Sequence, residues 1–258
     1  MAYCNLNHQN IDLFNYHCLT TDDAFVLHWQ MTNCERFALQ DLLRRIQPDI
    51  SIEVGTYLGG SLQVVSYFSR KVISIDIDPT VKERLFNRFY NVDFQVGISH
   101  QLLPDIISKY NVDDGDIEFV LIDGDHSAEG IRSDINALMS LKPRKRCVIL
   151  MHDSFNPDCR HGIKTADWSS SQYTKLVELD FIPGIFHEVA VDTAEALTMW
   201  GGFACAVLTP EPRREPLFIQ ASQQGLFEAV YKISRYNKSP WNWRANLMKL
   251  NRYLGRWS

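Results

Sequence analysis

The sequence predicts an α/β fold with a doubly wound, mostly parallel sheet of seven strands and helices on both faces. Short apolar runs alternate with amphipathic helical stretches from about residue 50 to residue 151. Strands that are separated by helices in this way pair in parallel and lie buried under helices on both faces. A glycine-rich turn, at residues 55–60, joins the first of these strands to the helix after it. We therefore expect a ligand crevice at the carboxyl ends of the strands, where open sheets of this class bind ligands.

The individual elements follow from local patterns along the chain. A helix is expected at residues 32–47, where apolar residues recur at helical spacing and Pro48 ends the pattern. Strands are expected at residues 50–55, 72–76, 92–96, 117–122 and 146–151. Helices between them are expected at residues 60–69, 79–90, 99–110 and 127–141. Residues 156–173 form a loop-rich region, and stretches 176–193 and 198–210 supply the last strands.

The turn Gly55-Thr56-Tyr57-Leu58-Gly59-Gly60 follows a short apolar strand that carries Glu53, and a helix opens at Ser61. Glycine permits positive φ and lets the backbone approach a ligand closely. The next strand ends in Asp76, which can accept hydrogen bonds from ribose hydroxyls. The spacing departs from the G-x-G-x-x-G of dinucleotide-binding proteins, and the Glu53 carboxylate suits a ligand with cationic parts. The stretch predicts a positively charged, nucleoside-like ligand.

This stretch resembles motif I and the following acidic motif of class I S-adenosylmethionine-dependent methyltransferases, which have a Rossmann-like fold. The resemblance implies that the turn holds the amino-acid and sulfonium end of the cofactor and that Asp76 holds its ribose. The segment Gly97-Ile98-Ser99-His100 resembles the one that touches adenine, although Ser99 equally suits a helix cap. The implied cofactor-binding residues are Glu53, Gly55, Thr56, Tyr57, Gly59, Ser61, Asp76, Ser99 and Asp123.

Two further groups of polar residues follow predicted strands. Residues 117–122 lead into Asp123-Gly124-Asp125-His126-Ser127, and residues 146–151 lead into His152-Asp153-Ser154. Both groups are expected at the edge of the sheet that carries the glycine turn, so three segments of chain converge on one crevice. Side chains of this kind, with water and substrate oxygens, can complete the shell of a divalent cation such as Mg²⁺.

The sequence IDGDHSAEGIRSDI, with the later MHDSFNP, resembles the saccharide and antibiotic O-methyltransferases of the cephalosporin hydroxylase, macrocin and mycinamicin group. It is more distantly similar to catechol O-methyltransferase, and the resemblance covers about residues 35–210. It implies that Asp123 and Asp153 bind the divalent cation, Mg²⁺ in the first instance, and that His126 beside Asp123 is the catalytic base. His152, the third candidate ligand, stands where the family has an acid. The metal is therefore a transition ion, or is held by the two aspartates alone, or is absent.

The expected reaction moves a methyl group from S-adenosylmethionine to a hydroxyl of a small molecule, a saccharide or a glycosylated natural product. A bound cation lowers the pKa of the hydroxyl, and a histidine with a pKa near 7 can take the proton. Structural roles compete with these assignments, because His126 or Ser127 can cap the next helix and Asp153 can form a turn. Two other functions stay open: a cofactor-binding module without transfer activity, and an oxidoreductase or hydroxylase on the same fold.

Other polar residues suit structural positions. Glu129, Arg132 and Asp134 fit a solvated helix face. Arg160, His161 and Trp168 line an acceptor pocket or, more simply, pack within a loop. The six cysteines are scattered with no C-x-x-C pair, which favours free and mostly buried thiols.

We expect a methyltransferase domain at residues 1–210, with an N-terminal cap at residues 1–34, and a basic helical extension at residues 211–258. The extension holds nine Lys and Arg against three Asp and Glu, and apolar residues recur at helical spacing from Trp243 to Trp257. Such a helix docks on its own chain or a second subunit, or lies on an anionic membrane surface. The net charge of -5 gives no reason to expect nucleic acid. The lack of a leader pattern and of a long apolar run predicts a cytoplasmic protein.

Overall fold

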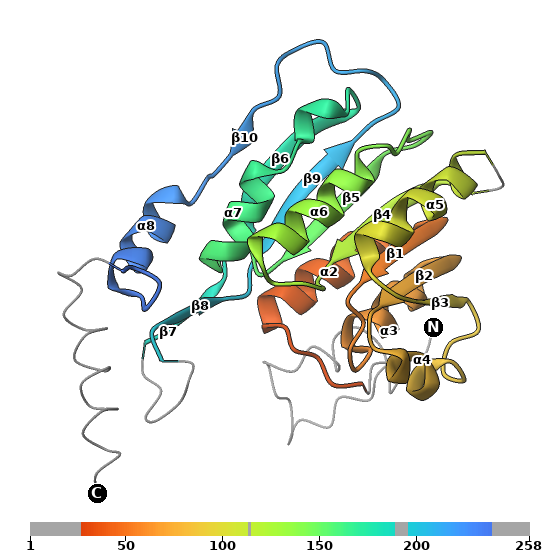
Figure 1. Ribbon diagram of the computed structural model, residues 1–258, viewed down its shortest axis with the longest axis horizontal. Coiled ribbons are helices and arrows are strands. Elements are labelled where there is room, and N and C mark those ends of the chain that lie inside the picture. Colours follow the sequence, from red (N-terminus) through yellow and green to blue (C-terminus); the bar gives the residue numbers. More distant parts are fainter. Residues whose placement is uncertain (1–26, 113–114, 189–195, 239–258) are drawn as a thin grey trace, which may run out of the picture.

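The computed structural model describes residues 27–112, 115–188 and 196–238, and its main feature is one eight-stranded sheet (Figure 1). The order of its strands is β10-β6-β9-β5-β4-β1-β2-β3. Their bounds are Ile50–Val54 for β1, Lys71–Asp76 for β2, Val92–Val96 for β3, Ile117–Ile122 for β4, Cys147–His152 for β5, Thr174–Ile182 for β6, Phe203–Leu208 for β9 and Ile219–Gln220 for β10. A second, antiparallel sheet pairs β7, Ile185–His187, with β8, Thr198–Trp200.

The sheet confirms the predicted doubly wound, mostly parallel architecture. Strands β1 to β5 are parallel to one another, whereas β9 runs antiparallel to both of its neighbours, β5 and β6. The strand order reverses between β1 and β4, which places the ends of these two strands at the topological switch point. The predicted count of seven strands is one too low because β10, a pair of residues beside β6, has no sequence pattern long enough to identify it.

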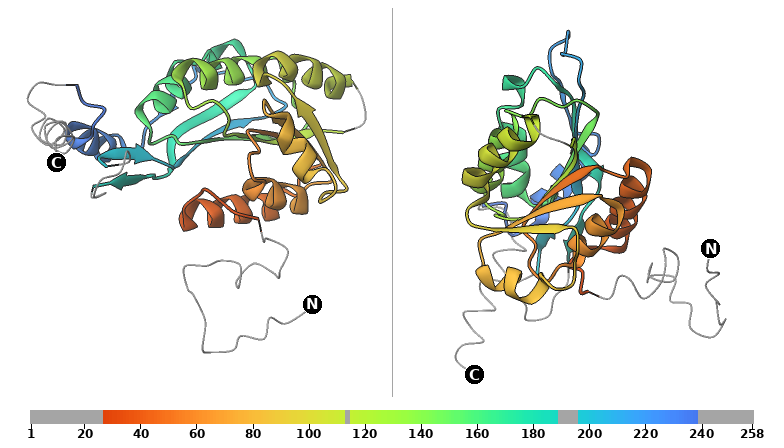
Figure 2. Two further views of the ribbon diagram at one scale, coloured as in Figure 1. Left: turned by 60° about the horizontal axis from the view of Figure 1, so that its bottom comes forward. Right: turned by 90° about the vertical axis from the view of Figure 1, so that its right-hand side faces the viewer.

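Helices cover both faces of the sheet, which therefore has two hydrophobic cores (Figure 2). The helices are α2 at Asn33–Ile46, α3 at Gly60–Phe68, α4 at Pro79–Leu85, α5 at Ser99–Val112, α6 at Ala128–Leu138, α7 at Pro157–Thr165 and α8 at Gln224–Ile233. Helices α5, α6 and α7 lie along one face, while α2 and α3 lie along the other. Burial of apolar side chains on both faces fixes the strand ends that carry the polar residues.

Helix α7 occupies part of the region predicted to be a loop. Asn156 is its N-cap and accepts hydrogen bonds from the backbone N–H of Asp158 and Cys159, and Pro157 occupies the first turn. Asn followed by Pro is a helix-start signal, but the short and mostly polar stretch that follows lacks a clear apolar period. By contrast, the helix predicted at residues 32–47 is confirmed by α2. Thr32 and Glu35 form a capping box that fixes its start.

The sheet continues past residue 210, where the sequence predicts that the methyltransferase domain ends, because β10 pairs with β6. Helix α8 lies within the helical extension expected at residues 211–258. The amphipathic helix expected from Trp243 to Trp257 lies outside the described residues. Among the helices that the structure describes, none has the length and apolar character needed to cross a membrane.

Candidate functional site

A cavity of about 1020 Å³ opens at the carboxyl ends of β1, β2, β4 and β5. This volume is at the upper end of what a cofactor or drug-sized ligand occupies. The cavity brings together most of the residues that the sequence singled out, namely Gly55, Thr56, Tyr57, Ser61, Asp76, Ser99, Asp123, His126, His152 and Asp153. Glu53 and Gly59 do not line it, although their chain neighbours Val54 and Gly60 do.

Asp76 holds the glycine turn in place. One carboxylate oxygen, Oδ2, accepts hydrogen bonds from the backbone N–H of Thr56 and of Tyr57, both at 2.9 Å. The other oxygen, Oδ1, accepts from the backbone N–H of Asp78 at 2.9 Å. A carboxylate has about four acceptor sites, so Asp76 can close the turn and still accept hydrogen bonds from a ligand in the cavity.

The glycines of the turn are needed chiefly because the protein packs against them. Gly55 has φ of 83°, and a Cβ there would lie 2.1 Å from the backbone oxygen of Asp123. At Gly60 a Cβ would lie 2.3 Å from the backbone oxygen of His28. Besides permitting positive φ and a close approach of a ligand, these glycines let β4 and the segment before α2 pack against the turn.

Glu53 is fully buried beneath the turn. Its Oε2 accepts a hydrogen bond from the hydroxyl of Thr56 at 3.0 Å, whereas Oε1 has no hydrogen-bond partner among the described residues. Burial, with the charges of Asp123 and Asp76, raises the pKa of Glu53 to about 8. A buried carboxyl with an orphaned oxygen beside a ligand cavity is a fitting partner for a cationic group.

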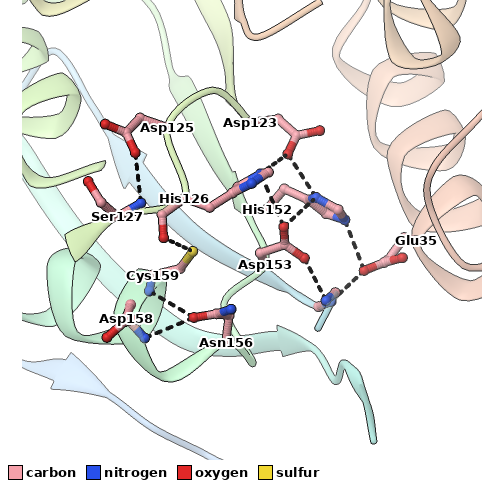
Figure 3. Close-up of polar contacts among 12 residues, drawn as sticks. Glu35, Asp123, Asp125, His126, Ser127, His152, Asp153, Asn156, Asp158 and Cys159 are labelled. Carbon is pink, nitrogen blue, oxygen red and sulfur yellow. Dashed lines mark hydrogen bonds and ion pairs between the residues drawn. The ribbon is translucent and has the colours of Figure 1, made fainter. Parts of the chain in front are cut away.

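Four titratable side chains converge at the ends of β4 and β5 (Figure 3). His152 Nδ1 lies 2.9 Å from Asp123 Oδ1 and 3.6 Å from Asp153 Oδ2. His126 Nε2 lies 3.4 Å from Asp123 Oδ1 and 3.2 Å from Asp153 Oδ2. Two imidazoles therefore share two carboxylates. Asp153 adopts a left-handed backbone conformation, with φ of 56°, that turns its side chain back toward this group.

A fifth member of the cluster, Glu35, comes from α2. Its Oε1 lies 3.2 Å from His152 Nε2, and the carboxylate also accepts from the backbone N–H of Gly202. The adjacent backbone N–H of Gly201 donates to Asp153 Oδ1 at 2.6 Å. Glu35 is not among the predicted site residues, because its place in a capping box is its only mark in the sequence.

Mutual charge sets the protonation of the cluster. Burial would raise the pKa of Asp123, but the charge and hydrogen bonds of His152 and His126 outweigh it and lower that pKa to about 2. The hydrogen bond to Asp123 raises the pKa of His126. Burial lowers the pKa of His152, yet Asp123 and the other carboxylates raise it well above its usual value. Burial raises the pKa of Asp153. The carboxylates thus attract cations, whether protons or a metal ion.

The donor set also fits a metal ion. One ligand atom each from Asp123, His152 and Asp153 lie within 4.8 Å of one another. Donors that bind one ion at right angles with bonds of about 2.1 Å lie roughly 3 Å apart, close to the 2.9 Å between His152 Nδ1 and Asp123 Oδ1. Carboxylates and imidazole are ligand types that divalent metal ions use in proteins.

The structural alternatives for several residues are settled by their contacts. Ser127 is the N-cap of α6 and accepts a hydrogen bond from the backbone N–H of Gly130 at 3.0 Å, which leaves His126 outside the cap. Asp134, expected on a solvated face, is buried, and its carboxyl accepts a hydrogen bond from the Ser99 hydroxyl beside the cavity. This contact with α5 explains why the prediction for Asp134 was wrong.

Arg160, His161 and Trp168, in the region that the sequence predicted to be a loop, do not line the cavity. Arg160 is buried in an ion pair with Asp180, at 2.7 Å, and lies over the ring of Phe227. Trp168 is buried and donates its ring N–H to the backbone of Ile163. The interpretation of these residues as structural packing is the one their contacts support.

Part of the cavity lining comes from the two short strands β7 and β8, whose residues the sequence did not mark as site residues. Ile185 and His187 come from β7, and Trp200 comes from β8. The rings of Trp200 and His126 meet edge to face with centroids 5.9 Å apart. His28 and Gln30, from the segment before α2, also line the cavity. These residues form a surface at which an acceptor can lie beside the histidine.

The comparisons with known proteins agree with this architecture. Residues 52–154 match a family model described as a methyltransferase domain. The O-methyltransferase TomG from Streptomyces achromogenes, involved in tomaymycin synthesis and solved with S-adenosylmethionine, is similar in fold, with 16% identity and a TM-score of 0.50 over 69% of this chain and 81% of that one. An O-methyltransferase from Bacillus cereus, solved with S-adenosylhomocysteine, has 16% identity and a TM-score of 0.48 over 67% and 79%. No curated protein matches the chain significantly in sequence.

The family match begins within β1 and ends just after β5, and so it spans the glycine turn, Asp76, the Asp123 group and Asp153. The same segment supplies the parallel strands β1 to β5 and most of the lining of the cavity. Residues 52–154 therefore match a methyltransferase domain, and the chain has the Rossmann-like fold of such enzymes.

Proposed function

We propose that this protein is an O-methyltransferase that moves the methyl group of S-adenosylmethionine to a hydroxyl of a saccharide or a glycosylated natural product, with the help of a divalent cation. The observation that carries the proposal is the shared cavity. It holds the glycine turn with Asp76 and, at the neighbouring strand ends, the two imidazoles and two carboxylates around Asp123.

The cofactor end of the cavity would be formed by the turn. Glu53 offers its orphaned Oε1 to the ammonium group of the cofactor, and Asp76 offers its remaining acceptor sites to the ribose. Ser99, held by Asp134, lies at the end toward the nucleobase. Gly55 and Gly59 keep the turn in its positive-φ conformation, with Thr56, Tyr57 and Ser61 along its course.

The reacting end would be formed by the cluster. Asp123, Asp153 and His152 would hold the cation, and His126 is the base. When bound, the cofactor supplies an electrophilic methyl group and the cation lowers the pKa of the acceptor hydroxyl. His126 would take the proton of the acceptor hydroxyl as that oxygen displaces sulfur from the methyl carbon, and the electron pair of the carbon–sulfur bond would stay on sulfur. In the free protein, Asp123 and Asp153 raise the pKa of His126 and so favour its protonated form. A bound cation would neutralise these carboxylates, lower the pKa of His126 again and leave the neutral imidazole that can act as a base.

Trp200 favours a sugar over a small aliphatic alcohol as the acceptor. Its ring lies beside His126 and lines the cavity. An aromatic ring gives a flat apolar platform with a slightly negative face, which suits the C–H face of a sugar whose hydroxyl points toward the base.

Transfer of labelled methyl from S-adenosylmethionine tests this proposal. The protein should methylate saccharide or glycoside acceptors when a divalent metal is present, and EDTA should abolish the transfer while metal added in excess restores it. The product is located on oxygen by mass spectrometry and NMR. Methylation of nitrogen, or full activity in EDTA, would contradict the proposal.

Glu53→Gln should make cofactor binding nearly independent of pH. In the free protein the pKa of Glu53 is about 8, so ionisation on binding an ammonium group releases a proton below that pH. The wild-type affinity for S-adenosylhomocysteine should therefore rise, by up to about tenfold per pH unit, from pH 6 to pH 8. For the free protein the effect has the opposite sign, because the unfolded carboxyl ionises near 4.5 and the free energy of unfolding falls as pH rises toward 8.

Calorimetric titrations in several buffers measure both the affinity and the proton release. The variant keeps the size of the side chain and should show weaker binding with a flat pH profile. A flat profile for the wild-type protein would contradict the role of Glu53.

The boundary at residue 210, the N-terminal cap, self-association and a cytoplasmic location stay proposals. The basic segment at residues 239–258, with its proposed contact to a membrane surface or a neighbouring subunit, lies outside the described residues. Proteolysis of the full chain, with mass spectrometry of the stable fragment, locates the boundary.

A further inference from the structure

Glu35 and His152 form a buried pair that joins two parts of the chain far apart in sequence. The side chain of Glu35 is 1% exposed and that of His152 is 7% exposed. Glu35 Oε1 lies 3.2 Å from His152 Nε2, and Glu35 Oε2 accepts from the backbone N–H of Thr32 at 2.5 Å. The carboxylate is thus fixed at the start of α2, with one oxygen aimed at the imidazole (Figure 3).

This contact decides which ring nitrogen of His152 can bind a metal. An ionised carboxylate only accepts hydrogen bonds, so Nε2 must carry the hydrogen that it donates to Glu35. In a neutral imidazole the other nitrogen then has a free lone pair. That nitrogen, Nδ1, is the one that faces Asp123 and Asp153.

We propose that Glu35 is a positioning residue that fixes His152 with its Nδ1 lone pair toward Asp123 and Asp153, so that the site selects a transition ion such as Fe²⁺, Co²⁺ or Zn²⁺ over Mg²⁺. The inference rests on the proposed function, because it concerns the cation of the same site. Imidazole suits these ions, whereas Mg²⁺ prefers a shell of oxygens. A carboxylate behind a metal-bound histidine orients the ring and makes it a stronger ligand.

The pair also accounts for the histidine itself. An acid at position 152 would set a second carboxylate against Glu35 in a place where both side chains are almost fully buried. Like charges so close cannot both stay ionised, and Glu35 already serves the backbone N–H groups of Thr32 and Gly202. A glutamate at position 35 therefore requires a hydrogen-bond donor at position 152.

Titration of the purified full-length protein with Co²⁺, followed by the visible absorption of the bound ion and by calorimetry, tests the inference without any acceptor. The wild-type protein should bind one equivalent of Co²⁺ and prefer it to Mg²⁺ by at least about tenfold. Glu35→Ala should weaken Co²⁺ binding by about 10- to 100-fold. Glu35→Gln should recover most of the affinity, because its amide oxygen still accepts the hydrogen bond from His152.

Thr32→Val is the matched control, since it removes the threonine half of the same capping box and leaves the contact between Glu35 and His152 in place. It should bind Co²⁺ as the wild-type protein does, and thermal unfolding shows that each variant is folded. If folded Glu35→Ala binds Co²⁺ as tightly as the wild type, the inference is wrong while the metal site stands. If the wild-type protein binds neither Co²⁺ nor Mg²⁺, the metal in the proposed function is wrong.

A double variant tests selectivity directly. Glu35→Gln with His152→Asp replaces the imidazole with a carboxylate and removes the opposing charge. The ratio of Co²⁺ to Mg²⁺ affinity should fall by at least about tenfold relative to the wild type, because the shell becomes all oxygen. An unchanged ratio would show that His152 does not bind the ion.

Discussion

His126→Gln should lower kcat by about 10²- to 10⁴-fold, the range lost when a general base is removed, with any acceptor that the wild-type protein methylates. His126 Nε2 lies 3.2 Å from Asp153 Oδ2 at the edge of the cavity, where it can reach an acceptor held beside the same carboxylates. Glutamine keeps a hydrogen-bond donor near these carboxylates but cannot take a proton. The affinities for S-adenosylhomocysteine and for the metal should therefore change little.

Steady-state kinetics over a range of pH, with separate titrations of cofactor and metal, measure this effect. His161→Gln makes the same replacement at an exposed residue of α7 that does not line the cavity, and it should leave kcat unchanged. If His126→Gln turns over within about threefold of the wild type, His126 is not the base and the proton leaves by another route.

Asp123→Asn should remove divalent metal binding and, with it, methyl transfer. The carboxylate lies 2.9 Å from His152 Nδ1 and 3.4 Å from His126 Nε2, so it is shared by a proposed metal ligand and the proposed base. Loss of a residue that supports a ligand costs about 10- to 100-fold in metal affinity. Asp123 is itself a proposed charged ligand, so its replacement should lower the metal affinity by at least about 100-fold.

The same Co²⁺ titration measures this loss. Asp125→Asn, two residues along the chain, is the matched control, because an asparagine oxygen can still accept the hydrogen bond from the backbone N–H of Ser127. It should bind metal as the wild-type protein does. Tight metal binding by Asp123→Asn would show that the cation lies elsewhere.

The parts of the fold that were predictable are those with a strong local signal. Strand β1, the glycine turn and α3 form one compact unit, and strands β1 to β5 are short stretches rich in apolar residues. Their parallel pairing follows from the alternation of these strands with helices. Strand β10 was not predicted, because two residues are too few to show a strand pattern in the sequence. Ile219 and Gln220 pair with β6 because the path of the chain brings them beside it.

The candidate site was predictable to the extent that its residues follow strands. Asp76, Asp123 and Asp153 lie at carboxyl ends, and the fold places all such ends at one edge. Glu35 was not predictable, since it is separated from His152 by 117 positions and only tertiary packing brings them together. Asp134 likewise became buried through a partner in another helix, Ser99, which its own sequence neighbours do not reveal.

We expect the cavity above the glycine turn to hold S-adenosylmethionine, with its ammonium group bound by Glu53. Calorimetric titration of the wild-type protein with S-adenosylhomocysteine at about pH 6 and pH 8 tests this expectation most directly. We predict one molecule bound per chain, tighter binding at the higher pH and release of a proton on binding below pH 8. Absence of binding at both pH values would contradict it.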